Sequence, residues 1–323
     1  MTESAAPRGD STVGVHAAVF VAMFLISFSY PVGEAIANEL DTGVLLFLRF
    51  AVATIVFGSL VAWRHGLAWP GWRAIAGYAA ISTSLVAFFW CMFYGLRTTS
   101  ALNTGAISTL IPGLTAIPGA ILVGERLGWH RLAALGIGLV GALWVVFRGD
   151  WDRFLALDLN EGDLIYFAGC VAMGFYSPLV KLFHRGEPVM VMTFWIATIN
   201  AVGLLLIANS AFWTMDWGAV PLFAYGGVAF VTLCSTVIAS FLMQWGTIRI
   251  GPTRVQAYSY LLPALVLLID WALGKGLPSM LTIPGILIVL AASLVIQRGE
   301  IFAGRSADYE RAPSAAAISG VRC

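Results

Sequence analysis

Two short stretches, each with a serine four residues before a proline, are the clearest candidates for chemistry in this 323-residue chain. They read STLIPGL at 108–114 and SYLLPAL at 259–265, and both lie inside long apolar segments. A proline within a helix cannot donate to the carbonyl four residues earlier, so Pro112 and Pro263 would release the carbonyls of Ser108 and Ser259. In an apolar medium such carbonyls must face protein or a water-filled cavity. The pattern predicts two bent helices beside a polar site.

A backbone that opens at each proline would begin its second half with free amide groups and end its first half with free carbonyls. These groups could hold the carboxylate and the ammonium of a zwitterionic ligand. The alternative is that each proline only bends its helix for packing, with water or serine hydroxyls satisfying the carbonyl.

Further candidates for ligand contacts are aromatic, amide and hydroxyl side chains in the segments expected around this site. A mostly apolar cleft with a few polar anchors suits ligands with large or apolar side chains. With the two serines and two prolines above, the candidates are Ser27, Tyr30, Trp90, Tyr94, Asn103, Tyr176, Gln256, Tyr258 and Tyr260.

Charged residues inside apolar segments are functional candidates, because an isolated charge is costly there. Arg49 is the only basic residue well inside such a segment. Glu34 and Asp270 fall toward the same end of their segments, and either could pair with Arg49. We favour a structural or gating ion pair over direct contact with a substrate. No acidic residue is expected at the middle of an apolar segment, so the sequence offers no carboxylate for a buried proton relay.

We expect no catalytic residue, metal site or cofactor. The histidines fall at segment ends, and three of the four cysteines lie within apolar runs.

Composition defines the class of protein. Hydrophobic residues make up 59% of the chain and charged residues 11%, whereas soluble domains carry about 25% charged residues. About 20 apolar residues cross a bilayer as a helix. The sequence therefore predicts an all-α integral membrane protein with ten transmembrane helices, at 14–34, 43–62, 74–96, 101–123, 129–147, 162–183, 189–209, 221–243, 254–273 and 281–297.

The distribution of lysine and arginine predicts the orientation. With the N-terminus inside, thirteen of the eighteen basic residues lie on the inner side and four on the outer side. Both termini are therefore expected in the cytoplasm. The net charge of +1 gives no indication of a nucleic-acid partner.

The segment 94–127 resembles 245–277, with the serine and proline of each motif aligned. Each half then holds five spans, and an odd number requires the second half to enter the membrane from the opposite side. Such inverted repeats place a site between the halves. We expect an N-terminal tail at 1–13, a first repeat at 14–147, an outer linker at 148–161, a second repeat at 162–297 and a cytoplasmic tail at 298–323.

The stretch TSALNTGAISTLIPGLTAIPGAILVGERLGWHRLAALGIGLVGALWVV (99–146) resembles the EamA signature of the drug/metabolite transporter superfamily. GDLIYFAGCVAMGFYSPLVKLF (162–183) is similar to the start of the second repeat in that family. The second copy departs from the pattern at 273–277, where LGKGL replaces the Gly-Glu-Arg turn, so a symmetric role for Glu125 is in doubt.

The resemblance implies a transporter of the bacterial inner membrane that exports small metabolites by alternating access. We expect amino acids as substrates, aromatic or other apolar ones in particular, and a functional monomer in the lipid bilayer. The alternatives are export of drugs or of other metabolites such as sugar derivatives, and, with least support, a membrane scaffold or enzyme. A nucleotide-sugar carrier would need more basic residues in its cavity, and a cationic-drug pump would need a buried carboxylate.

Overall fold

The computed structural model describes residues 12–125, 128–147, 149–150, 152, 159–274 and 280–298. All regular elements in this part of the chain are helices. Those of the N-terminal half are α1 (Thr12–Ser27), α2 (Ser29–Ile36), α3 (Thr42–Arg64), α4 (Trp72–Gly95), α5 (Ala101–Ile107), η1 (Ser108–Leu110), α6 (Ile111–Val123) and α7 (Trp129–Val146).

The C-terminal half begins with two long helices and continues through shorter pieces joined end to end. They are α9 (Glu161–Phe183), α10 (Val189–Thr214), α11 (Leu222–Val231), η2 (Thr232–Ala239), α12 (Ser240–Ile250), α13 (Pro252–Ala257), η3 (Tyr258–Leu261), α14 (Leu262–Ala272), η4 (Met280–Thr282) and α15 (Ile283–Arg298).

Eight helical segments of the described chain are long and apolar enough to cross a membrane. The spans expected at 129–147 and 281–297 correspond to shorter apolar helices. The 16 residues of α15 rise about 24 Å, less than the roughly 30 Å of hydrocarbon. The structure thus supports eight of the ten expected spans by length and composition.

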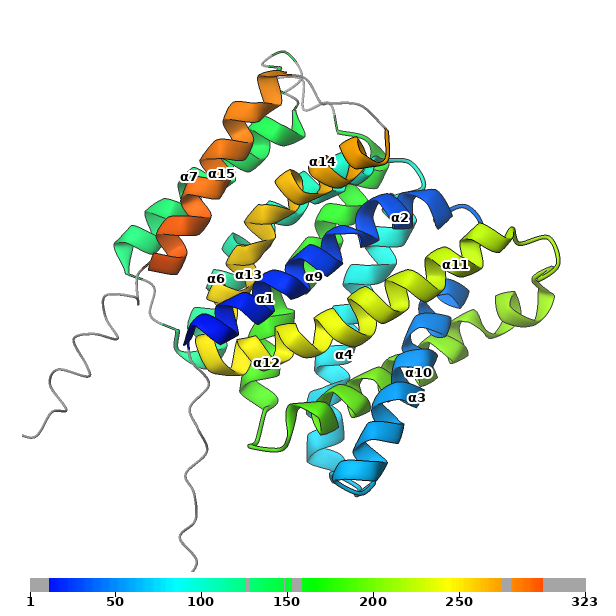
Figure 1. The fold of residues 1–323 in the computed structure, drawn as a ribbon. Coiled ribbons are helices and arrows are strands. Elements are labelled where there is room, and N and C mark those ends of the chain that lie inside the picture. Colours follow the sequence, from blue (N-terminus) through cyan, green and yellow to red (C-terminus); the bar gives the residue numbers. More distant parts are fainter. Residues whose placement is uncertain are drawn as a thin grey trace, which may run out of the picture.

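Helices from the two halves of the chain lie side by side. In Figure 1, α7 and α15 form a pair at one edge of the bundle, and α3 and α10 lie together at the opposite edge. Between them α6 contacts α13, while α9 packs against both α4 and α6. The buried core therefore lies where the two halves meet.

Two of the long helices, α3 and α9, begin at residues whose side chains cap a helix N-terminus. Asp41 accepts hydrogen bonds from the amides of Gly43 and Val44 at the start of α3. Asn160 and Asp163 form a capping box at the start of α9. Caps of this kind satisfy amides that have no partner within the helix, so they fix where these two spans enter the core.

A close backbone contact joins α6 and α9 at Gly174. A Cβ atom at this position would lie 2.8 Å from the carbonyl oxygen of Leu114. We expect Gly174→Ala to lower the free energy of unfolding by about 1–3 kcal/mol, because the two helices must move apart. Thermal unfolding in detergent measures this effect.

The matched control is Gly203→Ala on α10, where a Cβ atom would meet nothing within 4 Å. There the gain in helix propensity should leave stability unchanged or raised by about 0.5–1 kcal/mol. Equal unfolding temperatures for the two variants would contradict the assigned contact.

Candidate functional site

Both serine–proline motifs interrupt the α-helix as a short 3₁₀ turn. In the first motif this turn is η1, followed at once by Pro112, and in the second it is η3, followed by Pro263. The amide of Ile111 donates to the carbonyl of Ser108, and the amide of Leu262 donates to the carbonyl of Ser259. The carbonyls expected to be free are therefore satisfied by the residue before each proline. The expected open half-helices are wrong for this structure: the chain tightens instead of opening.

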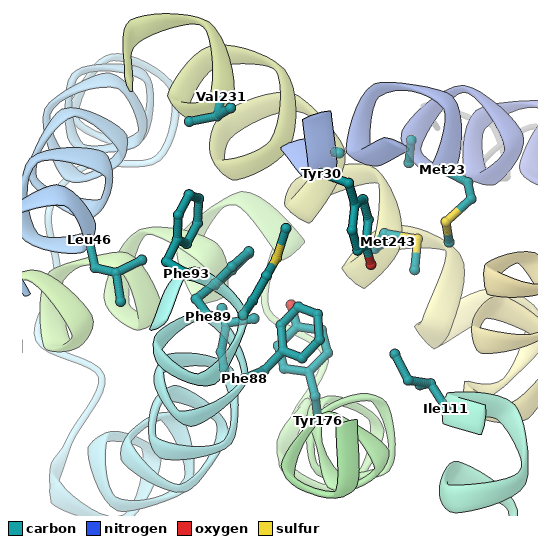
Figure 2. Close-up of a cluster of buried hydrophobic side chains, with 14 of the residues drawn as sticks. Met23, Tyr30, Leu46, Phe88, Phe89, Phe93, Ile111, Tyr176, Val231 and Met243 are labelled. Atoms are coloured by element: carbon teal, nitrogen blue, oxygen red, sulfur yellow. The ribbon is translucent and has the colours of Figure 1, made fainter. Parts of the chain in front are cut away.

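An enclosed cavity of about 50 Å³ lies beside these two turns. Its wall is mostly apolar and includes the flexible side chains of four methionines, at positions 23, 92, 173 and 243, and the rings of Phe88 and Phe89. Figure 2 shows Tyr30, Phe88, Ile111 and Met243 around the same central space. A cavity of this size holds a few water molecules.

Several hydroxyl and amide groups line the same cavity. The side chains of Ser29 and Tyr176 are buried. Ser29 Oγ makes no hydrogen bond within the described chain, and the Tyr176 hydroxyl makes none of normal geometry, with the Gln244 side chain as a polar neighbour. The side-chain amide of Gln256 donates from Nε2 to Ser177 Oγ at 2.7 Å. Ser259 Oγ donates to the backbone carbonyl of Gln256 at 2.7 Å. A buried hydroxyl without a partner is unfavourable, so Ser29 and Tyr176 are the groups best placed to bind a polar ligand.

Three hydroxyls form a buried cluster next to the cavity. The Tyr30 hydroxyl lies 2.6 Å from Ser108 Oγ and 3.0 Å from the Tyr166 hydroxyl. Ser108 Oγ lies 2.5 Å from the Tyr166 hydroxyl and donates to the Thr104 carbonyl at 2.8 Å. The cluster joins α2, η1 and α9 at one wall of the cavity.

The structure brings together some of the residues chosen from the sequence. Tyr30, Tyr176, Gln256 and Ser259 line the cavity. Ser108 does not line the cavity itself, but its Oγ is hydrogen-bonded to the hydroxyl of Tyr30, which does. Pro112 and Pro263 are buried, and the residues before them, Ile111 and Leu262, line the wall.

Six other candidates lie elsewhere. Tyr94 is 44% exposed and stacks near Arg97, and Trp90 lines a separate groove between α4 and α10. The Tyr260 hydroxyl donates to the Leu135 carbonyl of α7.

The remaining three bind local partners. Ser27 donates to the Phe24 carbonyl, Asn103 to Asp163, and the Tyr258 hydroxyl lies 2.8 Å from His16 Nδ1. The structure does not bring these six residues to the central cavity, because their helices turn them toward other neighbours.

The partners of Arg49 in the described chain are hydroxyl groups, and the structure does not place Glu34 or Asp270 beside it. Arg49 Nε donates to Thr236 Oγ1 at 2.9 Å, and Nη2 lies 3.5 Å from Ser235 Oγ. Within the described part of the chain, neither Glu34 nor Asp270 is a partner of Arg49. The reason is the arrangement of the helices: α3 packs on α10 and η2, whereas Asp270 lies on α14, which packs on α5 and α1.

The EamA-like transporter family model matches the chain twice, over residues 14–147 and 160–298. The chain belongs to the EamA-like transporter family. The two matches cover nearly all of the described helices, and the residues that line the central cavity lie within them.

Curated relatives of this EamA-family chain are distant. An uncharacterized transporter of Bacillus subtilis, YyaM, is 24% identical over 75% of this chain and 80% of its own length. A protein of Streptantibioticus cattleyicolor named as a probable terminal-alkyne amino-acid exporter is 22% identical over 70% of this chain and 72% of its own.

One crystal structure has a similar fold, with a TM-score of 0.66. It is 19% identical and covers 88% of this chain and 98% of its own. This similarity concerns the fold alone.

Some cavity residues were not among the candidates chosen from the sequence. They include Ser29, Ser235, Ser240 and the four methionines. A serine or methionine in an apolar span carries little signal by itself, because both occur throughout membrane helices. For Ser235 and Ser240 a signal was available: Thr232, Thr236 and Ser240 recur every four residues, the spacing of one helix face, and Ser235 precedes Thr236 in an otherwise apolar span.

Proposed function

We propose that this EamA-family transporter exports amino acids with aromatic or other apolar side chains, and that the central cavity is the substrate site. The observation that carries this proposal is the pair of buried hydroxyls without partners, Ser29 and Tyr176, in a cavity otherwise lined by methionine and phenylalanine. The apolar side chain of such an amino acid would pack against the methionine and phenylalanine side chains, and its polar groups would form hydrogen bonds with the two hydroxyls. The relative named as an amino-acid exporter supports the same substrate class and the direction of transport.

The proposed mechanism is alternating access by two inverted five-helix repeats with ten spans in all. Corresponding helices of the two halves lie together, α3 with α10 and α7 with α15. Both halves also carry a 3₁₀ turn before a proline in their fourth span. The two family matches, one in each half, support a repeat as well.

Substrate binding requires the cavity to expand. About 50 Å³ is too small for an amino acid with a large side chain. Met23, Met92, Met173 and Met243 supply flexible side chains that can rearrange at little cost. Entry and release would follow from one half rocking against the other.

We assign no cofactor and no enzymatic reaction to this site. The cavity forms within one chain, so we propose that the monomer is the functional unit. The excess of lysine and arginine on one side supports cytoplasmic termini in a bacterial-type inner membrane.

Counterflow in proteoliposomes tests the substrate class. Liposomes preloaded with unlabelled amino acid should accumulate the labelled form, faster for phenylalanine, leucine and methionine than for aspartate or lysine. Repeating the assay with and without a pH gradient separates facilitated from proton-coupled transport, and we expect little difference. Liposomes without protein are the control, and no counterflow for any amino acid would refute the substrate class.

A further inference from the structure

The side chain of Arg49 is a buried positive charge in the middle of a membrane-spanning helix. None of its surface is exposed, and it lies on α3 within the span Thr42–Arg64. Its hydrogen-bond partners are the neutral hydroxyls of Thr236 and Ser235. Among the residues that the structure describes, no carboxylate pairs with it. An arginine inside a membrane span usually pairs with an acidic side chain. The described residues provide no such partner for Arg49.

One donor group of this guanidinium is not used by the protein. Arg49 Nη1 is buried and makes no hydrogen bond within the described chain. The guanidinium carbon lies 4.4 Å from the centre of the Phe89 ring and 5.0 Å from that of Phe93. Ring faces attract a cation but accept hydrogen bonds poorly. A further acceptor with negative charge would complete the site.

The wall of the central cavity is also the environment of Arg49. Ser235 and Phe89 both contact Arg49, and both line the cavity. Figure 2 shows Phe89 and Phe93 between Leu46, which lies on α3 with Arg49, and the cavity residues Tyr30 and Tyr176. One layer of side chains therefore separates the guanidinium from the cavity.

The backbone that presents Ser235 and Thr236 to Arg49 is unusual. Both residues belong to η2, a π-helical segment of eight residues within an otherwise α-helical span. Such wide turns are rare and are frequently found at functional sites. Here the wide turn directs two successive hydroxyls to one guanidinium and leaves Ser235 at the cavity surface.

We propose that Arg49 is the specificity residue for carboxylate-bearing substrates, and that it selects acids over the corresponding amides and amines. Once the cavity has expanded past the side-chain layer that contains Phe89, the substrate carboxylate would supply the negative charge and the acceptor for Nη1, while Ser29 and Tyr176 bind the remaining polar groups. This inference rests on the proposed function for the location of the substrate. It assigns recognition of the substrate carboxylate to Arg49 and makes a free carboxylate a requirement for tight binding.

A binding experiment separates this inference from the amino-acid assignment. Thermal unfolding of the full chain in detergent is followed with 3-phenylpropionate and, separately, with 3-phenylpropionamide. The two probes have the same ring and chain but differ in charge, and neither is an amino acid. We expect the acid to bind about 10- to 100-fold more tightly than the amide, the range of a charge-assisted hydrogen bond.

Variants of Arg49 then test the residue itself. Arg49→Gln should abolish the preference for the acid, and Arg49→Lys should retain part of it because the charge remains. Arg64→Gln, at the exposed end of the same helix, is the matched control and should keep the full preference. A purely structural Arg49 would change the unfolding temperature without changing the acid-to-amide ratio.

Two results would overturn the proposal. One is a wild-type chain that binds acid and amide equally, a comparison that needs no variant to fold. The other is an Arg49→Gln variant that still prefers the acid. Counterflow reports on the amino-acid function independently, so a preference for the acid without amino-acid transport would refute only the substrate assignment.

Discussion

Replacing Ser29 with leucine is expected to lower amino-acid transport by about 100-fold, because the longer, branched side chain extends into the space where the substrate binds. Ser29 lines the central cavity, which measures only about 50 Å³. The thermal stability should remain unchanged or rise. The serine hydroxyl is buried without a hydrogen bond, an arrangement that costs about 1–3 kcal/mol, and leucine removes it.

The measurement is counterflow in proteoliposomes together with the unfolding temperature in detergent. Ser59→Leu is the control, because Ser59 lies on α3 with an exposed side chain that donates only to the Ile55 carbonyl. This control should transport at the wild-type rate. Wild-type transport by Ser29→Leu would mean that the substrate does not pass through the cavity.

Alanine at either proline of the two motifs is expected to lower transport about tenfold, since small displacements in a binding site have large effects. Alanine restores the amide that proline lacks, and this amide can compete with Ile111 or Leu262 for the serine carbonyl. The 3₁₀ turn would relax toward an α-helix. Ile111 and Leu262, which line the cavity, would move with it.

Transport rates of Pro112→Ala and Pro263→Ala in counterflow test this expectation. Pro70→Ala, in the connection between α3 and α4, controls for the loss of a proline as such. Unchanged transport in both motif variants would show that the prolines serve packing alone.

The fold could be predicted from the sequence because membrane spans depend on length and composition. The stretch 162–183 was expected as a helix, and the structure has α9 at Glu161–Phe183. The break at each serine–proline motif was also predictable, since proline removes a specific hydrogen bond. Its form was not, because whether a chain opens or tightens depends on the neighbours of the freed carbonyl.

The site could be predicted only in part. Tyr176 and Tyr94 are both aromatic residues in apolar spans, but Tyr176 lines the cavity and Tyr94 is 44% exposed. These helices carry apolar residues on all sides, so hydrophobic periodicity does not show which face turns inward. For Arg49, the sequence suggested a carboxylate partner, whereas hydroxyl groups and rings provide its contacts.

The most direct test of the central claim is a structure of the chain with a bound amino acid. The ligand is an amino acid that counterflow has shown to be transported, and it carries a heavy atom such as iodine on an aromatic ring. We predict its density between Tyr30, Met243 and Gln256, with the carboxylate directed toward Ser235 and Arg49. Density confined to another place, such as the groove between α4 and α10 beside Trp90, would contradict the central cavity as the substrate site.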